Sequence, residues 1–203
     1  MRLGLLADIH ENVTNLRIAL EHFRRERVDR VVVLGDIFQM RRDLDETVEL
    51  LVEAGAIGVW GNHEFGLAYQ PAEDIRQSYA GPVLDFMTSL RPRLVLGPCH
   101  FSHVEPWLNP EVLDDIWWGD GLPSTVPRLA QSFSAVPQPY IFLGHFHCWR
   151  LAGPDGVIEW NGERPVCMPP DRRFLIIVHG LDDGRYALFD TETGWLKPYT
   201  IGS

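Results

Sequence analysis

The feature that most constrains the fold is a series of short apolar runs, each of which stops at a polar or glycine-containing cluster. These runs cover residues 3–7, 31–34, 56–60 and 140–143. Between the first three runs, over residues 13–23 and 44–52, the apolar side chains are spaced at helical intervals. Strands that alternate with helices at this spacing predict βαβ units and a largely parallel sheet.

The residues at the expected helix starts fit this pattern. Asn12 is suited to cap the first helix. Asp43 with Glu46 resembles a capping box at the second helix, with Asp in the usual Ser or Thr place. Residues 72–90 predict a further helix that is interrupted near Gly81-Pro82.

The second half of the chain is expected to be mainly β-structure. Strands are predicted at residues 94–96, 99–102, 140–143, 157–160, 174–178, 186–189 and 195–201. Tight hairpin turns are predicted at Asp182-Asp183-Gly184 and Glu192-Thr193-Gly194. The proline- and tryptophan-rich segment 104–139 is expected to form loops with one or two short helices. Two packed sheets with helices outside accommodate both halves, so we expect one domain over residues 1–203, with segment 104–139 as an insertion near the site.

Charge narrows the class of partner. The 203 residues include 18 Lys and Arg against 28 Asp and Glu, a net charge of −10. Such a surface repels a phosphate backbone, so strong nucleic-acid binding is not expected. A phosphorylated ligand would need a local concentration of positive charge.

The sequence also predicts the compartment. No apolar run approaches the ~18 residues of a membrane-spanning helix, and residues 1–10 do not resemble a signal peptide. Cys99, Cys148 and Cys167 form no CxxC pair, and their odd number favours free thiols in a reducing environment. We therefore expect a cytoplasmic protein without membrane contacts.

Polar clusters follow the four apolar runs and the predicted strand at residues 99–102. They are Asp8-Ile9-His10, Gly35-Asp36, Gly61-Asn62-His63-Glu64, His103 and Gly144-His145-Phe146-His147. Although a single Asp after a strand is usually a helix cap, five such clusters in one chain favour a shared site. The carboxyl ends of strands in an open α/β sheet lie at one edge, where ligands bind. We therefore expect these distant clusters to converge.

The donor types indicate metal binding. Carboxylate, amide and imidazole donors without thiolates suit Mn, Fe, Zn or Co. The clusters offer more donors than one ion needs, so two ions that share one carboxylate are expected. Two divalent ions against the carboxylates of Asp8 and Asp36 would make the site locally positive, as a phosphate ligand requires.

In this order, the motifs DxH, GD, GNHE, H and GHxH resemble those of the calcineurin-like metallophosphoesterase superfamily. Residues 186–194 also resemble the last hairpin of its small bacterial phosphodiesterase-type members. The resemblance implies a four-layer α-β-β-α sandwich of two mixed sheets. It implies that the following residues bind metal: Asp8, His10, Asp36, Asn62, His103, His145 and His147.

The resemblance also implies their roles. Asp8, His10 and His147 would hold the first metal, and Asn62, His103 and His145 the second. Asp36 would bridge the two and count as catalytic, and a metal-bridging hydroxide would attack phosphorus. His63 would be a catalytic residue that stabilises developing charge and protonates the leaving group. We expect Mn first, with Fe, Zn, Ni or Co as alternatives.

Several residues allow two interpretations. His100 competes with His103 for the fourth motif, and we favour His103 because it lies nearer the end of its strand. Glu11 replaces the glycine that usually follows DxH, so it either tilts outward or places a carboxylate near the substrate path. His22 and His179 are interpreted as structural, and Cys148 as a buried free thiol.

The expected substrate is a small-molecule phosphate ester, of the diester or nucleotide type. The protein phosphatases of the superfamily carry GDxxDRG and RGNHE, whereas this chain has Met40 and Trp60 in place of the two arginines. The alternatives are a non-catalytic scaffold, as in a retromer subunit with this fold, a phosphomonoesterase or protein phosphatase, and a nuclease. Three tryptophans, Trp107, Trp117 and Trp118, either stack on a base or aryl group or pack the insertion onto the body. The sequence does not predict the oligomeric state.

Overall fold

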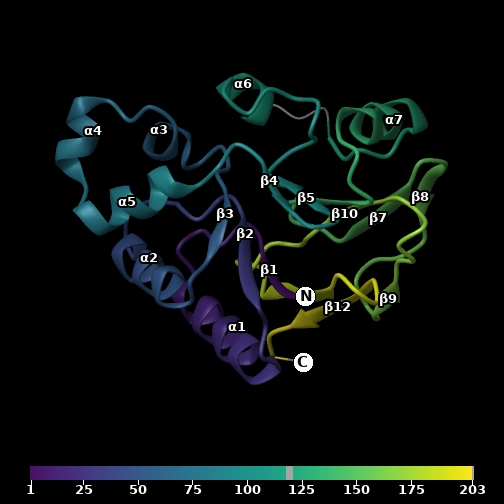
Figure 1. Ribbon diagram of the computed structural model, residues 1–203. Coiled ribbons are helices and arrows are strands. Elements are labelled where there is room, and N and C mark those ends of the chain that lie inside the picture. Colours follow the sequence, from purple (N-terminus) through teal and green to yellow (C-terminus); the bar gives the residue numbers. More distant parts are fainter. Residues whose placement is uncertain (118–120, 203) are drawn as a thin grey trace.

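The computed structural model of the chain describes residues 1–117 and 121–202. Two six-stranded sheets pack face to face, and helices cover their outer faces (Figure 1). Each sheet is mixed, with parallel strands in one part and antiparallel strands in the other. The structure thus confirms the expected α/β fold of two mixed sheets.

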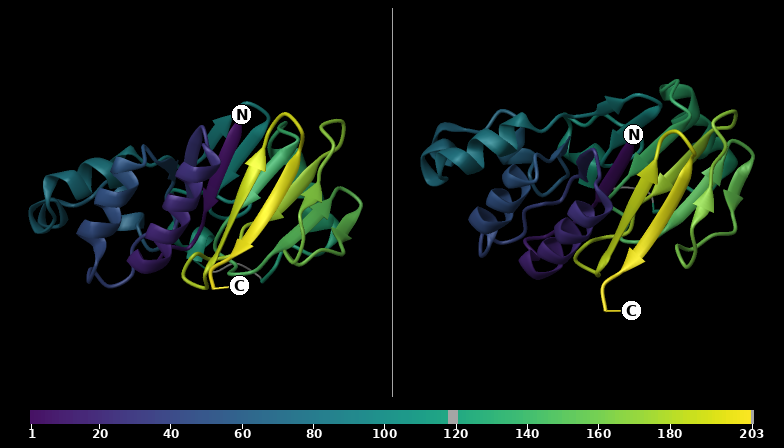
Figure 2. Two further views of the ribbon diagram at one scale, coloured as in Figure 1. Left: turned by 90° about the horizontal axis from the view of Figure 1, so that it is seen from below. Right: turned by 60° about the horizontal axis from the view of Figure 1, so that its bottom comes forward.

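The first sheet has the strand order β3-β2-β1-β11-β12-β9. Its parallel part consists of β1 (Arg2–Leu6), β2 (Arg30–Leu34) and β3 (Ile57–Val59). Its antiparallel part consists of β11 (Arg185–Asp190), β12 (Trp195–Thr200) and β9 (Val166–Cys167). The N-terminal strand β1 therefore lies in the middle of the sheet, beside the C-terminal β11–β12 hairpin (Figure 2).

The second sheet has the order β4-β5-β6-β10-β7-β8. Its parallel strands are β5 (Cys99–Ser102), β6 (Tyr140–Leu143) and β10 (Phe174–Ile177). Antiparallel strands flank them: β4 (Leu94–Leu96), β7 (Arg150–Gly153) and β8 (Gly156–Ile158). Both sheets thus place parallel strands next to one another, which brings several carboxyl ends to one side of the molecule.

Helices cover the two outer faces. The first sheet is covered by α1 (Val13–Glu26), α2 (Leu44–Glu53) and α5 (Gly81–Ser89), with the short α3 (Phe65–Ala68) and α4 (Glu73–Ser78) beside them. The helix α7 (Val126–Ala135) packs on the outer face of the second sheet, and α6 (Leu113–Trp117) precedes it. The described residues of segment 104–139 therefore include two helices. None of the helices in the described part of the chain is long and apolar enough to cross a membrane.

Strand β1 is buried on both faces, which explains its nearly continuous apolar sequence. Leu3 and Leu5 point into the core between the sheets, whereas Leu6 points toward the helices. Gly4 lies against α1, and a Cβ at this position would come within 2.6 Å of the Phe23 ring. The glycine therefore allows α1 to pack directly on the strand.

Local sequence signals failed in a few places. Strands β7 and β9 and helix α3 were not predicted, because each has only two to four residues and shows no apolar periodicity. The capping box at α2 is not formed: Asp43 makes no side-chain cap, and Glu46 pairs with Arg17 at 2.5 Å. The main-chain N–H of Asp43 instead donates to Glu11, a residue from another loop.

The predicted hairpin turn at Asp182-Asp183-Gly184 is wrong. These residues form a turn, but the strands on either side, β10 and β11, belong to different sheets. Residues 178–184 are therefore a crossover loop between the sheets. In contrast, the hairpin turn at residues 192–194 is confirmed, because β11 and β12 pair directly across it.

We expect the core between the sheets to dominate stability. Phe142 is fully buried there, and Phe142→Ala should lower the free energy of unfolding by about 3–5 kcal/mol. Val52 on α2 is 55% exposed, and Val52→Ala should change it by less than about 0.5 kcal/mol. Urea unfolding of the three proteins measures both values. Equal effects of the two substitutions would contradict this account of the core.

Candidate metal centre

The carboxyl ends of five parallel strands meet at one rim of the double sheet. Strands β1, β2 and β3 of the first sheet and β5 and β6 of the second each lead into one of the polar clusters. The structure brings together every site residue predicted from the sequence: Asp8, His10, Asp36, Asn62, His63, His103, His145 and His147. Their convergence follows from strand direction, as expected for α/β sheets.

One group of side chains, called here the first donor cluster, consists of Asp8, His10 and His147. The Nε2 atoms of His10 and His147 lie 3.2 Å apart. Asp8 Oδ1 lies 3.9 Å from His147 Nε2. All three residues can offer one atom each to the same point in space.

The second donor cluster consists of Asn62, His103 and His145. Asn62 Oδ1 lies 3.0 Å from His103 Nε2 and 3.1 Å from His145 Nδ1. The two imidazole nitrogens are 3.2 Å apart. The donors thus form a small triangle of one oxygen and two nitrogens.

Asp36 lies between the two clusters. Its Oδ2 is 4.0 Å from His10 Nε2 in the first cluster, and its Oδ1 is 3.4 Å from His103 Nε2 in the second. The main-chain N–H of His63 donates to Oδ1 at 3.1 Å, which fixes the orientation of the carboxylate. One oxygen of Asp36 therefore faces each cluster.

Three of the histidines are held from behind by an acceptor. His103 Nδ1 lies 2.7 Å from the carbonyl of Leu34, and His10 Nδ1 lies 3.4 Å from that of Phe38. His147 Nδ1 lies 2.8 Å from Asp183 Oδ2. A proton on Nδ1 satisfies each acceptor and leaves the Nε2 lone pair facing the cluster, as metal-binding histidines require.

The electrostatics of the site favour a cation. Burial and the neighbouring Asp36 raise the pKa of Asp8. Asp8 Oδ2 is buried and has no hydrogen-bond partner among the described residues. Burial would lower the pKa of His103, but Asp36 and Asp8 raise it to about 9. The buried carboxylates are therefore stabilised by nearby positive charge. Imidazole nitrogens that face one another, together with a carboxylate oxygen without a partner, form a donor set that suits metal ions.

The backbone is strained around this site. Left-handed φ angles, which disfavour residues other than glycine, occur at Asp8 (48°), His10 (46°), Glu11 (57°), Asp36 (53°), His145 (71°) and His147 (45°). Each such residue costs of order 1–3 kcal/mol and persists only where the surroundings enforce it. The turns that follow the strands thus hold the donor side chains close together at an energetic cost.

Two glycines permit the close approach of the loops. A Cβ at Gly35 would lie 2.5 Å from His103 Nδ1, and one at Gly61 would lie 2.1 Å from Asp36 Oδ1. Neither distance is compatible with a side chain. These glycines of the GD and GNHE motifs therefore allow the first sheet to approach His103 on the second.

Glu64 links the loops that follow β2 and β3. It is fully buried, and its carboxylate accepts hydrogen bonds from the main-chain N–H groups of Asp36 (2.9 Å), Phe38 (2.7 Å) and Gly61 (2.8 Å). The loop after β2 is thereby joined to the loop after β3. Burial raises the pKa of Glu64 to about 7.

Glu11 has a role that neither sequence-based alternative described. Its side chain is buried, only 6% exposed. Its carboxylate accepts main-chain hydrogen bonds from the loop after β2, from residues Gln39, Met40, Arg41, Arg42 and Asp43. Burial alone would raise the pKa of Glu11, but these bonds lower it. The acid thus orders this loop, at the cost of a left-handed backbone.

His63 belongs to neither donor cluster, but its ring lies close enough to His10 and Asp36 for these three side chains to hold one metal ion as well. Its ring lies edge-on to His10, with 4.8 Å between ring centroids, and stacks on Trp117 at 5.5 Å. Trp117 remains 43% exposed, so its indole borders the open side of the site. Trp107 is also partly exposed, whereas Trp118 lies outside the described residues.

The remaining histidines have other surroundings. His100 is buried on β5, with its neighbours in register on β4 and β6, and it makes none of the contacts that join the clusters. His22 contacts the Tyr186 hydroxyl at 3.0 Å. His179 Nδ1 lies 3.7 Å from Asp183 Oδ2. The contact between Asp183 and His147 was missed from the sequence, because Asp183 was assigned to a hairpin turn.

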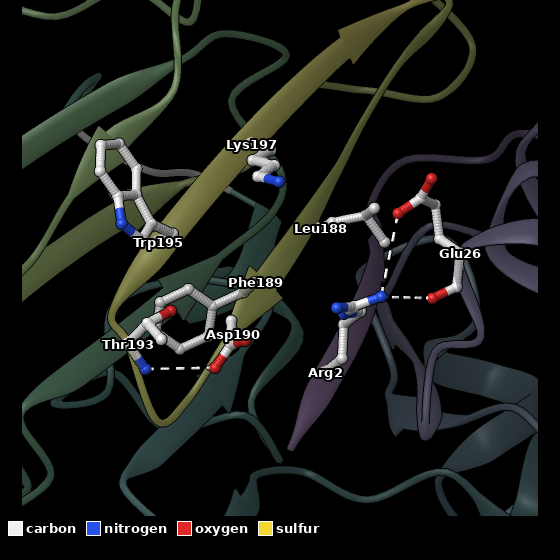
Figure 3. Close-up of a pocket in the computed structure, with 8 residues that line it drawn as sticks. All are labelled: Arg2, Glu26, Leu188, Phe189, Asp190, Thr193, Trp195 and Lys197. Carbon is white, nitrogen blue, oxygen red and sulfur yellow. Dashed lines mark hydrogen bonds and ion pairs between the residues drawn. The ribbon is translucent and has the colours of Figure 1, made fainter.

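The pocket in Figure 3 lies elsewhere. It is formed near β1, α1 and the β11–β12 hairpin and contains none of the clustered residues. Arg2 in its wall donates to the main-chain oxygen of Glu26 at 2.6 Å, and Asp190 accepts from Thr193 N at 3.1 Å. The first contact joins strand β1 to the end of α1, and the second stabilises the turn between β11 and β12. The polar groups of this pocket therefore serve local structure.

Comparisons with known proteins show the family of this chain and agree with its fold. Residues 1–161 match the model of the calcineurin-like phosphoesterase superfamily domain. The chain belongs to this superfamily, which confirms the resemblance seen in its motifs. It carries histidine and aspartate clusters suited to the metal centre of such proteins.

Three relatives illustrate the similarity. A metallophosphoesterase from Sphaerobacter thermophilus has a TM-score of 0.79 at 22% identity, covering 99% of this chain and 88% of that chain. An archaeal phosphodiesterase has a TM-score of 0.57 at 16% identity, covering 99% and 100%. An uncharacterized protein of Methanocaldococcus jannaschii is 22% identical over 221 residues, which cover 94% of this chain and 83% of the relative. At these identities, the structural matches show the fold.

Two substitutions of Glu11 should distinguish the stability that its carboxylate contributes from the stability that its left-handed backbone costs. Glu11→Ala should lower the free energy of unfolding by about 2–4 kcal/mol, because several main-chain N–H groups lose their acceptor while the strained φ remains. Glu11→Gly should lower it by about 1 kcal/mol less, since glycine tolerates this φ. Urea unfolding measures both, and hydrogen exchange should become faster at residues 39–43 in both variants. The exposed Glu49→Ala is the control, and an alanine variant as stable as the glycine variant would contradict the strain.

Proposed function

We propose that this protein is a two-metal phosphoesterase that hydrolyses phosphodiesters or nucleotide-type phosphate esters. The observation that carries the proposal is the position of Asp36, which turns one oxygen toward each of two donor clusters. The first cluster (Asp8, His10, His147) would hold one ion and the second (Asn62, His103, His145) the other. We expect Mn²⁺ first, with Fe, Zn, Ni or Co as alternatives, in a cytoplasmic protein.

In this proposal each group of residues has a different role in hydrolysis. Bound divalent ions supply Lewis acidity, which polarises a phosphoryl oxygen and acidifies water. Asp36 holds the two ion sites in a fixed relation, and the backing of the histidine rings keeps their lone pairs aimed at the ions. As a P–O bond forms with the water oxygen, the bond to the leaving oxygen breaks and its electron pair departs with that oxygen. In this proposal His63 gives this oxygen a proton from its ring.

The surroundings of the site favour a diester over a monoester dianion. Met40, which replaces one protein-phosphatase arginine, is 66% exposed. Trp60 replaces the other, and its Nε1 donates to the Pro110 carbonyl at 3.2 Å. The next residue, Arg41, lies over the Tyr79 ring at 4.1 Å from its centroid. At the two positions of the protein-phosphatase arginines, this chain therefore has no guanidinium that could bind the second negative charge of a monoester in a bidentate way.

Two further observations support this choice. One of the proteins with a similar fold is described as a phosphodiesterase. Trp117, stacked on His63 and partly exposed, offers an apolar face beside the expected leaving group. A scaffold would be free to lose ligands, whereas this chain retains every residue of the proposed site. We therefore favour the enzyme over the non-catalytic scaffold.

Metal reconstitution tests the proposal. Metal-stripped protein is reloaded separately with Mn²⁺, Zn²⁺, Ni²⁺ or Mg²⁺ and assayed on bis(p-nitrophenyl) phosphate and p-nitrophenyl phosphate. We expect metal-dependent cleavage of the diester, with the monoester cleaved more slowly. Good cleavage of the monoester alone would contradict the diester preference. Two bound ions without cleavage of either compound would support the scaffold.

Removal of the bridging charge should abolish the metal centre. We expect Asp36→Asn to lose both ions or most of its activity, because the amide keeps the shape of the side chain but not the charge shared by both clusters. Metal content by atomic absorption and diester turnover are the measurements. Full metal content with unchanged turnover would exclude a bridging role.

The proton donor should be separable from the metal ligands. We expect His63→Ala to retain its ions but to lower turnover by about 10²–10⁴-fold, the usual size of a proton-transfer contribution. His22→Ala, the same substitution far from the clusters, should leave turnover unchanged. Normal turnover of the His63 variant would remove this residue from the mechanism.

A further inference from the structure

We propose that Asp183 is a positioning residue, whose carboxylate holds the His147 ring so that Nε2 faces the first donor cluster. This inference rests on the proposed function. Asp183 Oδ2 lies 2.8 Å from His147 Nδ1, on the side of the ring opposite the cluster. The contact joins residues that lie 36 positions apart in the chain.

The place of Asp183 is set by the main chain. The N–H of Leu181 donates to the Ala7 carbonyl at 2.7 Å, and the N–H of Asp182 donates to the Asp8 carbonyl at 3.0 Å. The side chain of Asn15 also donates to the Leu181 carbonyl at 2.8 Å. The crossover loop (residues 178–184) is therefore fastened to the end of β1, directly beside the ligand Asp8. The crossover loop between the two sheets therefore places Asp183 beside His147.

The backbone of the loop approaches the ring closely. A Cβ at Gly180 would lie 2.9 Å from His147 Nδ1 and 3.3 Å from Asp183 Oδ2. Only a glycine at this position leaves room for the pair. The imidazole and the carboxylate are thus enclosed on one side by main chain, which restricts rotation of both side chains.

His147 needs such a partner more than the other ligands do. Its side chain is 36% exposed, whereas those of His10 and His103 are 8% and 2% exposed. Packing fixes the orientation of the latter two, and main-chain carbonyls back their rings. A carboxylate backing His147 selects the Nδ1–H tautomer and makes Nε2 a stronger donor to a metal. Asp183 therefore compensates at the first cluster for an exposed ligand.

The contact with His179 does not displace this role. His179 Nδ1 lies 3.7 Å from the same oxygen of Asp183, beyond hydrogen-bond distance, whereas His147 Nδ1 lies at 2.8 Å. Asp183 is itself 50% exposed. Its main polar contact is therefore the metal-facing histidine rather than a structural network.

Metal affinity tests the inference independently of catalysis. Mn²⁺ is titrated into metal-free protein against a competing chelator, and bound ions are counted by atomic absorption. We expect the wild type to bind two ions and Asp183→Ala to bind one of them about 10–100-fold more weakly, with the other unchanged. Asp183→Asn should retain part of the lost affinity, because its amide oxygen still accepts the Nδ1 proton.

The neighbouring acid provides a matched control. Asp182 Oδ1 accepts from Asn12 Nδ2 at 3.0 Å in the same loop. We expect Asp182→Ala to keep both Mn²⁺ affinities within about twofold, and urea unfolding of the metal-free variants to show similar stability for both alanine substitutions. Asp183→Ala with two wild-type affinities, or an equal loss in both variants, would overturn the positioning role. Wild-type protein that binds no ion would contradict the proposed function itself.

Discussion

The structure depends on the burial of two carboxylates, Asp8 and Asp36, where the two sheets meet. A buried charge is costly unless partners surround it. Here the partners come from the ends of five strands, so the charge can be compensated only when both sheets are assembled. The same assembly that forms the apolar core therefore also forms the site. The left-handed turns and the glycines at the strand ends follow from the need to bring ligands within reach of these carboxylates.

Hydrogen-bond partners distinguish structural acids from functional ones at this rim. Glu11 and Glu64 are buried, but main-chain N–H groups from neighbouring loops satisfy their oxygens. Asp8 has one such donor, from the main chain of His145, and its other oxygen has no partner among the described residues. The two glutamates therefore order loops, whereas the aspartate has unused capacity for a cation. Burial alone would not have separated these roles.

The sequence predicted that the polar clusters converge, because the direction of each strand decides at which edge of the sheet its last residues lie. Asp8, Asp36 and His145 each follow an apolar run, and parallel strands place such residues at one edge. Contacts between distant loops were not predictable. The replacement of glycine by Glu11 was visible, but the main-chain N–H groups that donate to its carboxylate lie about thirty positions along the chain. Asp183 looked like part of a hairpin, since local turn chemistry does not reveal that its two flanking strands belong to different sheets.

The two donor clusters differ in how they are held, although their donors are similar. In the second cluster, His103 is buried and backed by a main-chain carbonyl of β2, so the strands themselves fix its position. In the first, His147 is partly exposed and backed by a side chain from the crossover loop. A main-chain carbonyl behind a histidine ring moves only if the sheet itself changes. A side chain in the same position can be removed by one substitution. If the first cluster holds a metal ion, as proposed, a substitution in the crossover loop can therefore change its affinity without rebuilding the fold.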